Sequence, residues 1–306
     1  MADRGLILGL AIALDLAFGE PRGRRHPVAM GGRLMGAAHR PARARAAPTQ
    51  LAWGAAALLA FGTAAAGLGW AAERAPLPRP ARIVLLGILL KPTFSIRGLL
   101  EEGGRVATEL EQGRLAGARV ALRALVSRPT GSLDSPLAAS AAIESVAENL
   151  ADSIAAPLLY YVLFGLPGAA AYRVVNTADA MFGYRGETEW LGKPAARVDD
   201  LLGWVPSRLS ALALILAAAT RGGPLAARRA WQTCRSEGGR TASPNAGRPM
   251  AAMAGALGRR LEKKGAHTLG SGLDLPAPDD VRAALSLVAR SAGLIAILAG
   301  LASRRR

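Results

Sequence analysis

The chain has 306 residues, a formal net charge of +16, and 51% hydrophobic residues, of which few are aromatic. A mean hydropathy of +0.23 is high for a soluble protein, and an apolar mass of small and aliphatic residues suits helices that pack closely in lipid. The arginines cluster beside apolar runs without any nucleic-acid-binding signature, so we expect membrane anchoring and no nucleic-acid partner. Because Cys234 is the only cysteine, an internal disulfide and a cysteine-based metal cluster are excluded.

Six apolar segments are candidates for membrane spans. Residues 51–70 are the clearest, because about twenty uncharged residues match the thickness of the hydrocarbon core. Residues 5–18 are interpreted as a short, retained first span, since no convincing signal-peptide cleavage site follows. In the fourth segment Pro157, Gly165 and Pro167 favour a broken or re-entrant helix. The approximate spans are 5–18, 51–70, 83–96, 154–171, 205–219 and 285–302.

Charged residues inside these segments restrict how they can lie in a bilayer. Lys91 and Pro92 predict a kink in the third segment. Arg208 and Arg290 must lie near a helix end or face a polar interior, because a charge facing lipid is costly. We therefore predict an all-α, polytopic integral membrane protein, with residues 1–306 as a single membrane-embedded domain.

Three polar stretches separate the apolar segments. The very basic residues 19–50 are placed in the cytoplasm by the positive-inside rule, and residues 97–153, which show helical spacing of leucine and valine, follow on the same side. Residues 221–282 are interpreted as a long polar loop. If that loop is also cytoplasmic, a full last span would leave residues 304–306 outside. Either one weaker segment does not span, or the positive-inside rule is broken there. We expect a multi-pass protein of a bacterial inner membrane with its active site on the cytoplasmic side.

The strongest candidate for chemistry is an acidic row that leads into the fourth apolar segment. Glu144, Glu148 and Asp152 are spaced by four residues, which places three carboxylates along one side of a helix, with Ser145 and Asn149 beside them. Such a row needs solvent, arginines or a divalent cation, and Mg²⁺ commonly joins carboxylates to substrate phosphates. The alternative is an ordinary water-facing helix side, but ionisable groups next to a membrane segment are usually functional.

A second candidate follows that apolar segment. Arg173, Asn176 and Asp179 are three residues apart and share a helix face that ends near Tyr184 and Arg185. Asparagine and aspartate can join a cation shell, and arginine can form a bidentate contact with phosphate. A capped, solvated helix end is the alternative explanation.

Four further candidates are weaker on their own. His26 follows the first apolar segment; a lone histidine is more often structural, but it can also bind phosphate or move protons. Arg128 lies in a loop that would bind an anion, and Arg208 lies at a membrane-interface turn beside a tryptophan. Ser243 and Asn245 belong to a turn that can present backbone amides to an anion. No Walker A or dinucleotide-binding glycine pattern is present, so any use of nucleotide would be non-standard.

Taken together and in order, these stretches resemble the adenosylcobinamide-phosphate synthase (CobD/CbiB) family of cobalamin biosynthesis. The resemblance departs from the family pattern at Glu20, Pro129 and Arg248. The matching pieces are Leu14-Asp-Leu-Ala-Phe-Gly-Glu-Pro with His26-Pro-Val, Ser127-Arg, Ala142-Ile-Glu-Ser-Val-Ala-Glu-Asn-Leu-Ala-Asp, Ala156-Pro-Leu, Tyr172-Arg-Val-Val-Asn-Thr-Ala-Asp-Ala-Met-Phe-Gly-Tyr-Arg, Ala196-Arg-Val-Asp-Asp, Trp204-Val-Pro-Ser-Arg-Leu and Ser243-Pro-Asn-Ala-Gly.

The resemblance implies an ATP- and Mg²⁺-dependent amide ligase of a membrane. It would join a propionate carboxylate of adenosylcobyric acid to (R)-1-amino-2-propanol O-phosphate, or to the unphosphorylated aminoalcohol. The resemblance is also compatible with a homo-oligomer and with contacts to other membrane enzymes that act late in cobalamin biosynthesis. The roles that follow are Mg²⁺ binding by Glu144, Glu148, Asp152, Asn176 and Asp179, phosphate binding by Arg128, Arg173 and Arg185, and phosphate contact or proton transfer by His26; substrate contacts are also expected from Asn176, Tyr184, Arg208, Ser243 and Asn245.

The rival interpretation is a corrinoid transporter or a membrane scaffold. In that case Asp15 and Arg208 would line a pathway through the membrane. A transporter should carry polar residues in several full spans, whereas here they gather in one region and its flanking loops. That distribution favours an enzyme.

Overall fold

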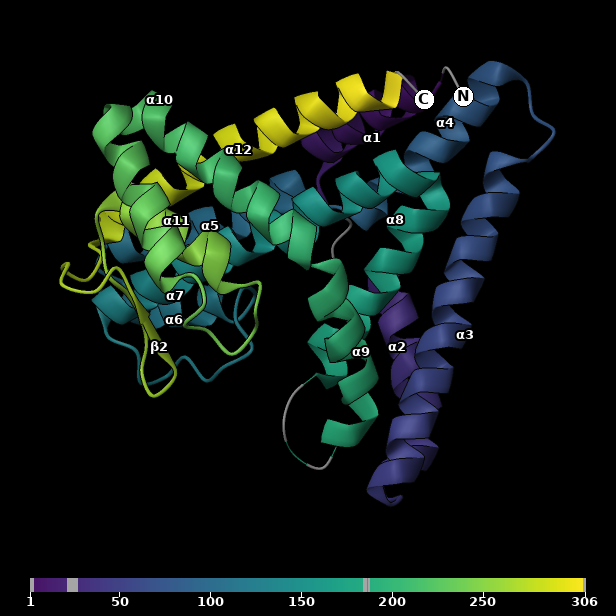
Figure 1. The fold of residues 1–306 in the computed structure, drawn as a ribbon, viewed down its shortest axis with the longest axis horizontal. Helices are drawn as coiled ribbons and strands as arrows, with labels where there is room; N and C mark the ends of the chain where they lie inside the picture. Colours follow the sequence, from purple (N-terminus) through teal and green to yellow (C-terminus); the bar gives the residue numbers. More distant parts are fainter. Residues whose placement is uncertain (1–2, 21–26, 184–185, 187, 305–306) are drawn as a thin grey trace. The chain divides into compact units, whose positions relative to one another are not determined.

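A computed structural model describes residues 3–20, 27–183, 186 and 188–304. The described chain is almost entirely helical, with one small β-hairpin (Figure 1). The prediction of an all-α polytopic membrane protein is thereby confirmed. In chain order the elements are α1 (Arg4–Phe18), α2 (Pro27–His39), η1 (Arg40–Ala42), α3 (Ala47–Glu73), α4 (Arg79–Leu90), η2 (Lys91–Thr93), α5 (Ile96–Glu111), α6 (Leu115–Leu122), α7 (Ser135–Leu150), the π-helix η3 (Ala151–Ala155), α8 (Ala156–Phe182), α9 (Glu189–Leu202), α10 (Trp204–Glu237), α11 (Gly247–Leu257), β1 (Leu261–Lys263), β2 (His267–Leu269) and α12 (Pro278–Arg304).

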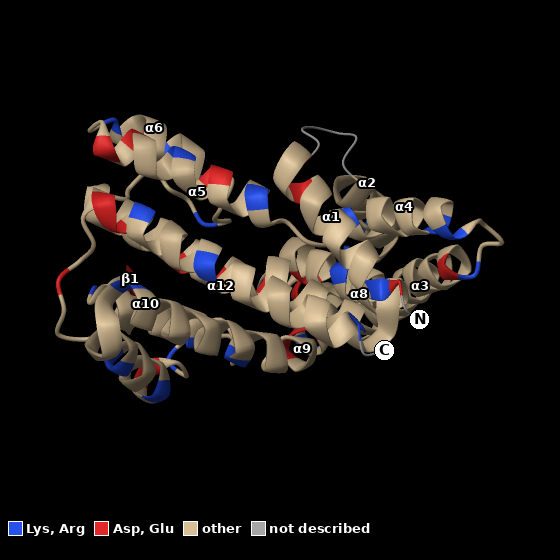
Figure 2. Cartoon of the chain, turned by 90° about the horizontal axis from the view of Figure 1, so that it is seen from above, with Lys and Arg blue, Asp and Glu red and all other residues tan. Residues whose placement is uncertain are grey.

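Among the described residues, five helical stretches are long and apolar enough to cross a bilayer, and they contain five of the six expected spans. The remaining expected span, residues 5–18, corresponds to α1, which has 15 residues and is shorter than a typical membrane-spanning helix. Among the described residues the longest uncharged run lies in α3, which carries no charged residue before Glu73 at its end. Figure 2 shows the charged residues of the other helices, for example along α5 and α12. The five stretches are Ala47–Glu73, Arg79–Glu111, Ser135–Phe182, Trp204–Glu237 and Pro278–Arg304.

The chain divides into two compact units. Unit 1 comprises Met1–Ser95, Ala156–Gly203 and Leu298–Arg306, and unit 2 comprises Ile96–Ala155 and Trp204–Ile297. Each unit therefore combines segments that are distant in the sequence.

In unit 1, α3 packs along α8 and α9, while α1 packs on α4. The approach of α3 to α9 is very close: a Cβ at Gly54 would lie 2.1 Å from the carbonyl oxygen of Leu191. Only glycine permits that distance, and small residues at helix interfaces are how membrane helices gain packing contacts. The expected kink at Lys91 and Pro92 is present as the 3₁₀ turn η2.

Helix α8 is broken in its middle, as its prolines and glycine predict. Gly165 has a φ of +73°, and Pro167 follows it. The amide of Leu166 begins the second half of the helix and donates a hydrogen bond of 2.8 Å to Oε1 of Glu73 at the end of α3. The amide exposed by the break is therefore satisfied by a carboxylate from a neighbouring helix.

A buried ion pair lies between α1 and η2 of unit 1. The side chain of Asp15 is fully buried, and its Oδ1 lies 3.5 Å from Nζ of Lys91. The same ammonium group lies 2.8 Å from Oε1 of Glu20. The charge predicted inside the first apolar segment thus has a cationic partner, as a buried carboxylate requires.

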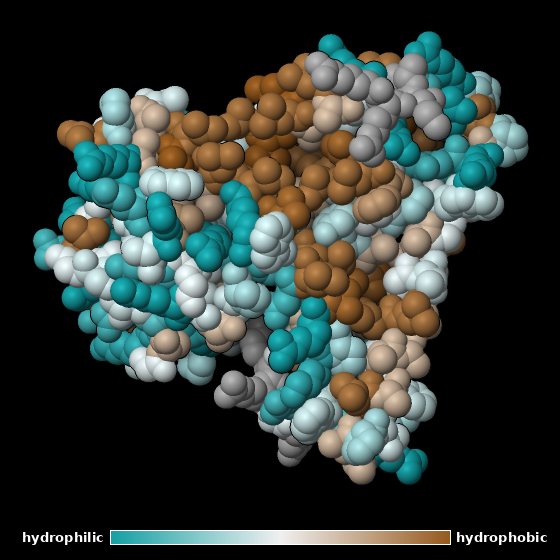
Figure 3. Space-filling model, in the orientation of Figure 1, coloured by the Kyte–Doolittle hydropathy of each residue, from teal (hydrophilic) through white to brown (hydrophobic). Residues whose placement is uncertain are grey.

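Unit 2 is built around α7. Every residue from Leu137 to Ala147 on this helix is buried, and α5, α6, α11 and β1 pack against it. A helix that is buried all round cannot be an ordinary water-facing helix, so the alternative explanation of the acidic row does not apply to Glu144. Figure 3 shows hydrophilic residues over the region of α11 and the hairpin, and hydrophobic residues along α12 and the first part of α10.

The expectation of a long polar loop over residues 221–282 is wrong. Helix α10 continues to Glu237 after a break at Gly223, which has a φ of +71°, and α11 and the β-hairpin follow. Some of the glycines and prolines that suggested a loop lie at helix breaks and starts, as Gly223, Pro224 and Pro278 do. Between them α11 is rich in alanine and methionine and is buried along nearly its whole length against α10 and α7.

Candidate functional site

The loop between α6 and α7 is held firmly and carries Arg128. Thr130 Oγ1 donates 2.8 Å to the Arg119 carbonyl, and Arg119 Nε donates 2.8 Å to the Leu133 carbonyl. Asp134 caps α7 by accepting a hydrogen bond of 3.0 Å from the amide of Leu137. These contacts fix the backbone around Arg128, whose side chain is only 20% exposed.

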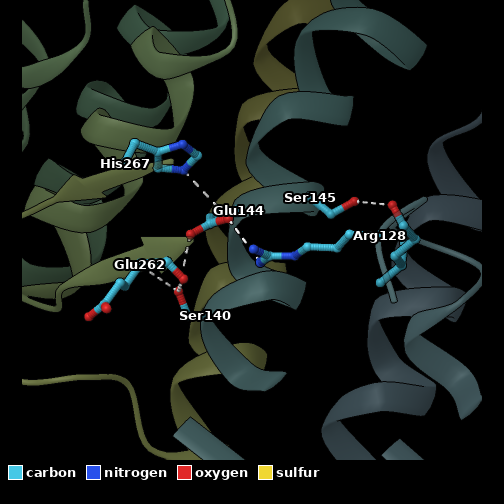
Figure 4. A network of polar contacts seen from close by, with 7 residues as sticks. Arg128, Ser140, Glu144, Ser145, Glu262 and His267 are labelled. Atoms are coloured by element: carbon cyan, nitrogen blue, oxygen red, sulfur yellow. Dashed lines mark hydrogen bonds and ion pairs between the residues drawn. The ribbon is translucent and has the colours of Figure 1, made fainter. Parts of the chain in front are cut away.

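The carboxylate of Glu144 lies at the centre of a polar network inside unit 2 (Figure 4). Its Oε1 accepts a hydrogen bond of 3.2 Å from Ser140, and Arg128 Nη2 lies 3.4 Å from Oε2. Nε2 of His267 lies 3.7 Å from the same Oε2. Glu144 and His267 have side chains that are 7% and 8% exposed, so the guanidinium and the imidazole flank one buried carboxylate.

The β-hairpin brings His267 to this network. Ser140 Oγ accepts a hydrogen bond of 2.7 Å from the amide of Glu262, which ties strand β1 to α7. The other end of the hairpin is held by Glu237, whose carboxylate accepts 2.6 Å from the amide of Gly270 and 3.3 Å from that of Ser271. The hairpin is thereby fixed at both ends, and the position of His267 is set by the fold.

The imidazole has an unused donor or acceptor. Within the described part of the chain, Nε2 of His267 has no hydrogen-bond partner, although it is buried and close to Glu144. A buried polar atom without a partner is costly, and native proteins keep such groups mostly where a ligand, ion or water completes them. The network is therefore suited to receive a polar ligand atom beside Glu144.

The other two carboxylates of the acidic row lie further along the helix. Glu148 and Asp152 are half-buried, and Asn149 between them donates 3.0 Å to the Ser145 carbonyl. Asp152 lies in the π-helix η3, which departs from the regular α-helical row. Among the residues that the structure describes, no group of three or more histidine, cysteine or acidic side chains is arranged to hold a metal ion, so Mg²⁺ binding by Glu144, Glu148, Asp152 and Asp179 stays a prediction.

Three of the predicted substrate-binding residues form a second cluster in unit 2. Arg208 Nη1 lies 3.3 Å from Oδ1 of Asn245, and its guanidinium lies 4.1 Å from the centroid of the Trp204 ring. Ser243 Oγ accepts a hydrogen bond of 3.2 Å from the amide of Asn245, which forms the expected turn. Arg208 lies in the second turn of α10, near the helix end, as its charge required.

The residues predicted after the fourth apolar segment lie in unit 1. Arg173 Nη1 donates 3.3 Å to Oδ1 of Asn176, so these two side chains meet on one face of α8, and Asn176 Nδ2 donates 3.5 Å to Oδ1 of Asp199 on α9. Asp179 is half-buried one turn further on, and its carbonyl accepts 2.7 Å from the amide of Gly183. His26, Tyr184 and Arg185 lie outside the described residues.

Sequence reasoning missed His267 and Ser140. His267 lies in the stretch that was interpreted as a loop. Gly265 lies between two short segments that each carry one buried leucine, Leu261 and Leu269. A glycine turn between two short segments is the available, though short, signal for a hairpin. Ser140 carried no signal, because its role depends on the amide that the hairpin presents to it.

Comparison with known proteins agrees with the order of the motifs. The model of the family described as "CobD/Cbib protein" matches residues 8–288. The chain belongs to the CobD/CbiB family. The cobalamin biosynthesis protein CobD of Dehalococcoides mccartyi is 39% identical over 96% of this chain and 95% of its own length. The cobalamin biosynthesis protein CobD of Geobacter metallireducens is 40% identical over 85% of this chain and 82% of its own length. The probable cobalamin biosynthesis protein CobD of Pyrococcus furiosus is 40% identical over 84% of this chain and 85% of its own length. No solved structure matches this CobD/CbiB chain significantly.

Proposed function

We propose that this chain is an adenosylcobinamide-phosphate synthase that forms an amide at the expense of ATP. The propionate carboxylate of adenosylcobyric acid would take a phosphoryl group from ATP, which leaves as ADP. The amine of (R)-1-amino-2-propanol O-phosphate, or of the free aminoalcohol, would then attack the carbonyl carbon, and phosphate would leave with its electron pair. Membership of a family whose curated members are named cobalamin biosynthesis proteins supports this proposal.

The observation that carries the proposal is the buried Arg128–Glu144–His267 network. A carboxylate is a poor electrophile, so the site must bind anionic groups close together and must accept the proton that the amine loses. Arg128 offers a guanidinium for a phosphate or carboxylate, and His267 offers a ring nitrogen that no described residue occupies. Glu144 would hold the guanidinium in place and orient the imidazole.

Magnesium fits part of the acidic row. Glu144 already faces a guanidinium and an imidazole, so we assign it to positioning. Glu148 and Asp152 are half-buried oxygen donors about one helical turn apart, and Mg²⁺ is commonly held by one or two carboxylates together with substrate phosphates. When bound there, the ion would neutralise charge on the phosphates of ATP.

The Arg208 cluster would serve a second anionic group. Its guanidinium is anchored by the Trp204 ring and carbonyl, and Asn245 beside it is buried. An arginine held in this way loses little conformational freedom when it binds a phosphate. We propose that it binds the phosphate of the amine substrate or of the nucleotide.

The test is ligation by the purified protein in lipid nanodiscs. Adenosylcobyric acid, either aminoalcohol, ATP and Mg²⁺ are supplied, and the corrinoid amide is quantified by mass spectrometry together with released ADP. Glu144→Gln should lower the rate by about 100-fold or more, because misplaced catalytic groups cost that much. Glu262→Gln is the matched control, because its amide joins the network while its carboxylate instead faces Arg260. Wild-type protein that forms no amide, or a Glu144→Gln variant as active as Glu262→Gln, would refute the proposal.

The transporter interpretation receives less support from the contacts of its two candidate residues. Asp15 is fully buried beside Lys91 and does not reach a surface. Arg208 is engaged with Trp204 and Asn245. Uptake of corrinoid into vesicles without any amide formation would favour the transporter instead.

A further inference from the structure

The second half of α10 is an amphipathic helix with a fixed inner face. It begins after the break at Gly223, and its buried residues Ala226, Ala230 and Cys234 recur at helical spacing. Helix α11 packs on this face so closely that a Cβ at Gly255 would lie 2.5 Å from the carbonyl oxygen of Arg229. The inner face is therefore fully used by packing within unit 2.

The outer face of the same helix combines cationic, aromatic and apolar side chains. Leu225 is 74% exposed and Trp231 is 53% exposed. Arg228 and Arg235 are also exposed, and neither pairs with a carboxylate of the described residues. An open hollow of about 570 Å³ lies on this face and is lined by Arg228, Trp231, Gln232, Arg235 and Ser236.

The first half of α10 indicates where this face lies relative to a bilayer. Its exposed residues Leu209, Leu212 and Leu216 recur at helical spacing, as on a surface that contacts lipid chains. This leucine stripe ends before Thr220, and the helix breaks three residues later at Gly223. The arginines and the tryptophan thus begin where the hydrocarbon-facing surface stops, at the level expected for lipid headgroups.

The residue types found at the level of the headgroups favour an anionic lipid as the ligand. Tryptophan is enriched at the boundary between headgroups and acyl chains, and arginine clusters next to a span attract anionic lipids. Two unpaired guanidinium groups around one hollow complement a phosphodiester, and Gln232 and Ser236 add neutral hydrogen-bonding groups. Leu225 extends the apolar contact beside the break.

We infer that the hollow formed by Arg228, Trp231 and Arg235 binds the headgroup of an anionic membrane phospholipid. The two arginines contact the phosphate, and the indole ring lies against the upper part of an acyl chain. The site belongs to α10 alone and does not depend on the proposed ligase activity. It is separate from the Arg208 cluster, which lies at the opposite end of α10.

The experiment uses full-length protein, delipidated in a neutral detergent. Phosphatidylglycerol, phosphatidylcholine and inorganic phosphate are added separately, and binding is followed by native mass spectrometry and by the melting temperature. Phosphatidylglycerol should bind and raise the melting temperature, and the other two should have little effect. Arg228→Gln/Arg235→Gln should weaken phosphatidylglycerol binding about tenfold or more, as loss of two headgroup-facing charges predicts.

Arg229→Gln is the matched control. It removes the same charge from the same helix, but its guanidinium lies against Gly258 at the end of α11, away from the hollow. Phosphatidylglycerol binding should therefore weaken more in Arg235→Gln than in Arg229→Gln. Equal binding of the two lipids, equal weakening by the two single variants, or full displacement of lipid by inorganic phosphate would overturn the inference.

A measurement on protein with native arginines keeps the inference testable if the double variant does not fold. The difference in fluorescence between wild type and Trp231→Phe isolates the signal of Trp231. Brominated phosphatidylglycerol should quench this signal more strongly than brominated phosphatidylcholine. Equal quenching by the two lipids, or none, would count against the site.

Discussion

Nε2 of His267 lies 3.7 Å from Oε2 of Glu144, and both side chains are almost completely buried. The two residues come from elements distant in sequence, a short β-hairpin and the central helix of unit 2. Arg128 approaches the same carboxylate oxygen from the loop before α7. The contact of Glu144 with Arg128 and its contact with His267 can therefore be removed one at a time by substitution.

The imidazole of His267 should matter for the reaction more than for stability. We expect His267→Gln to reduce the rate of amide formation by about 100-fold, the order of magnitude that a positioned proton acceptor provides. Nε2 makes no hydrogen bond within the described residues, so the melting temperature should change little. Thr268→Val, at the next position of the same strand, is the control and should keep near-normal activity. A His267→Gln variant with an unchanged rate would remove the histidine from the mechanism.

Arg128 and Glu144 should be energetically coupled. Arg128→Met leaves the buried carboxylate of Glu144 without its guanidinium partner. Loss of one partner of a buried ion pair costs about 3–5 kcal/mol of folding free energy. Because Arg128 is 20% exposed and its contact is long, the expected loss lies at or below the lower end of that range. The double variant Arg128→Met/Glu144→Gln should be less destabilised than the two single losses added together. Unfolding midpoints in detergent for the four proteins of the cycle measure this, and strict additivity would show that the pair does not interact.

Ser140 should hold the hairpin against α7. Ser140→Ala removes the acceptor for the amide of Glu262, and an unsatisfied buried amide costs about 1–3 kcal/mol. Hydrogen exchange should increase in residues 261–269 while it stays unchanged in α12. Ser236→Ala serves as control, since that hydroxyl is exposed and bonds only within its own helix. Unchanged exchange in the hairpin would mean that Leu261 and Leu269 hold it without the serine.

The close packing of α3 on α9 should distinguish two glycines of the same helix. Gly54→Ala would place a methyl group 2.1 Å from the Leu191 carbonyl oxygen, so the helices must separate, at a cost of about 1–3 kcal/mol. Gly62→Ala meets nothing within 4 Å and should leave stability unchanged or raise it by up to about 1 kcal/mol. Thermal unfolding of the two variants in the same nanodiscs compares them directly. Equal effects would argue against the tight α3–α9 contact.

The spans were predictable because their signal is local. About twenty uncharged residues in α3, and the proline and glycine that break α8, act through neighbours along the chain. The acidic row on α7 was also visible as a spacing of four residues. Its burial was not, because α7 is surrounded by elements that come from other parts of unit 2.

The region after residue 221 could not be interpreted correctly from composition. Its arginines and glycines resemble a loop. In the structure, Arg228 and Arg235 lie on the outer face of α10, Gly223 lies at a helix break, and the inner faces of α10 and α11 are rich in alanine. Such helices are stabilised mainly by tertiary packing, which a single sequence does not display. The place of His267 beside Glu144 was hidden for the same reason, since it results from the position of the hairpin on α7.

The contact between Glu73 and Leu166 bears on how the protein is assembled. A break in a helix leaves a backbone amide without its helical acceptor, and here the acceptor belongs to α3, which is synthesised well before α8. The carboxylate of Glu73 is therefore already in place when the second half of α8 leaves the insertion machinery. Loss of the Glu73 carboxylate should therefore appear as poor insertion and rapid degradation of newly made chains.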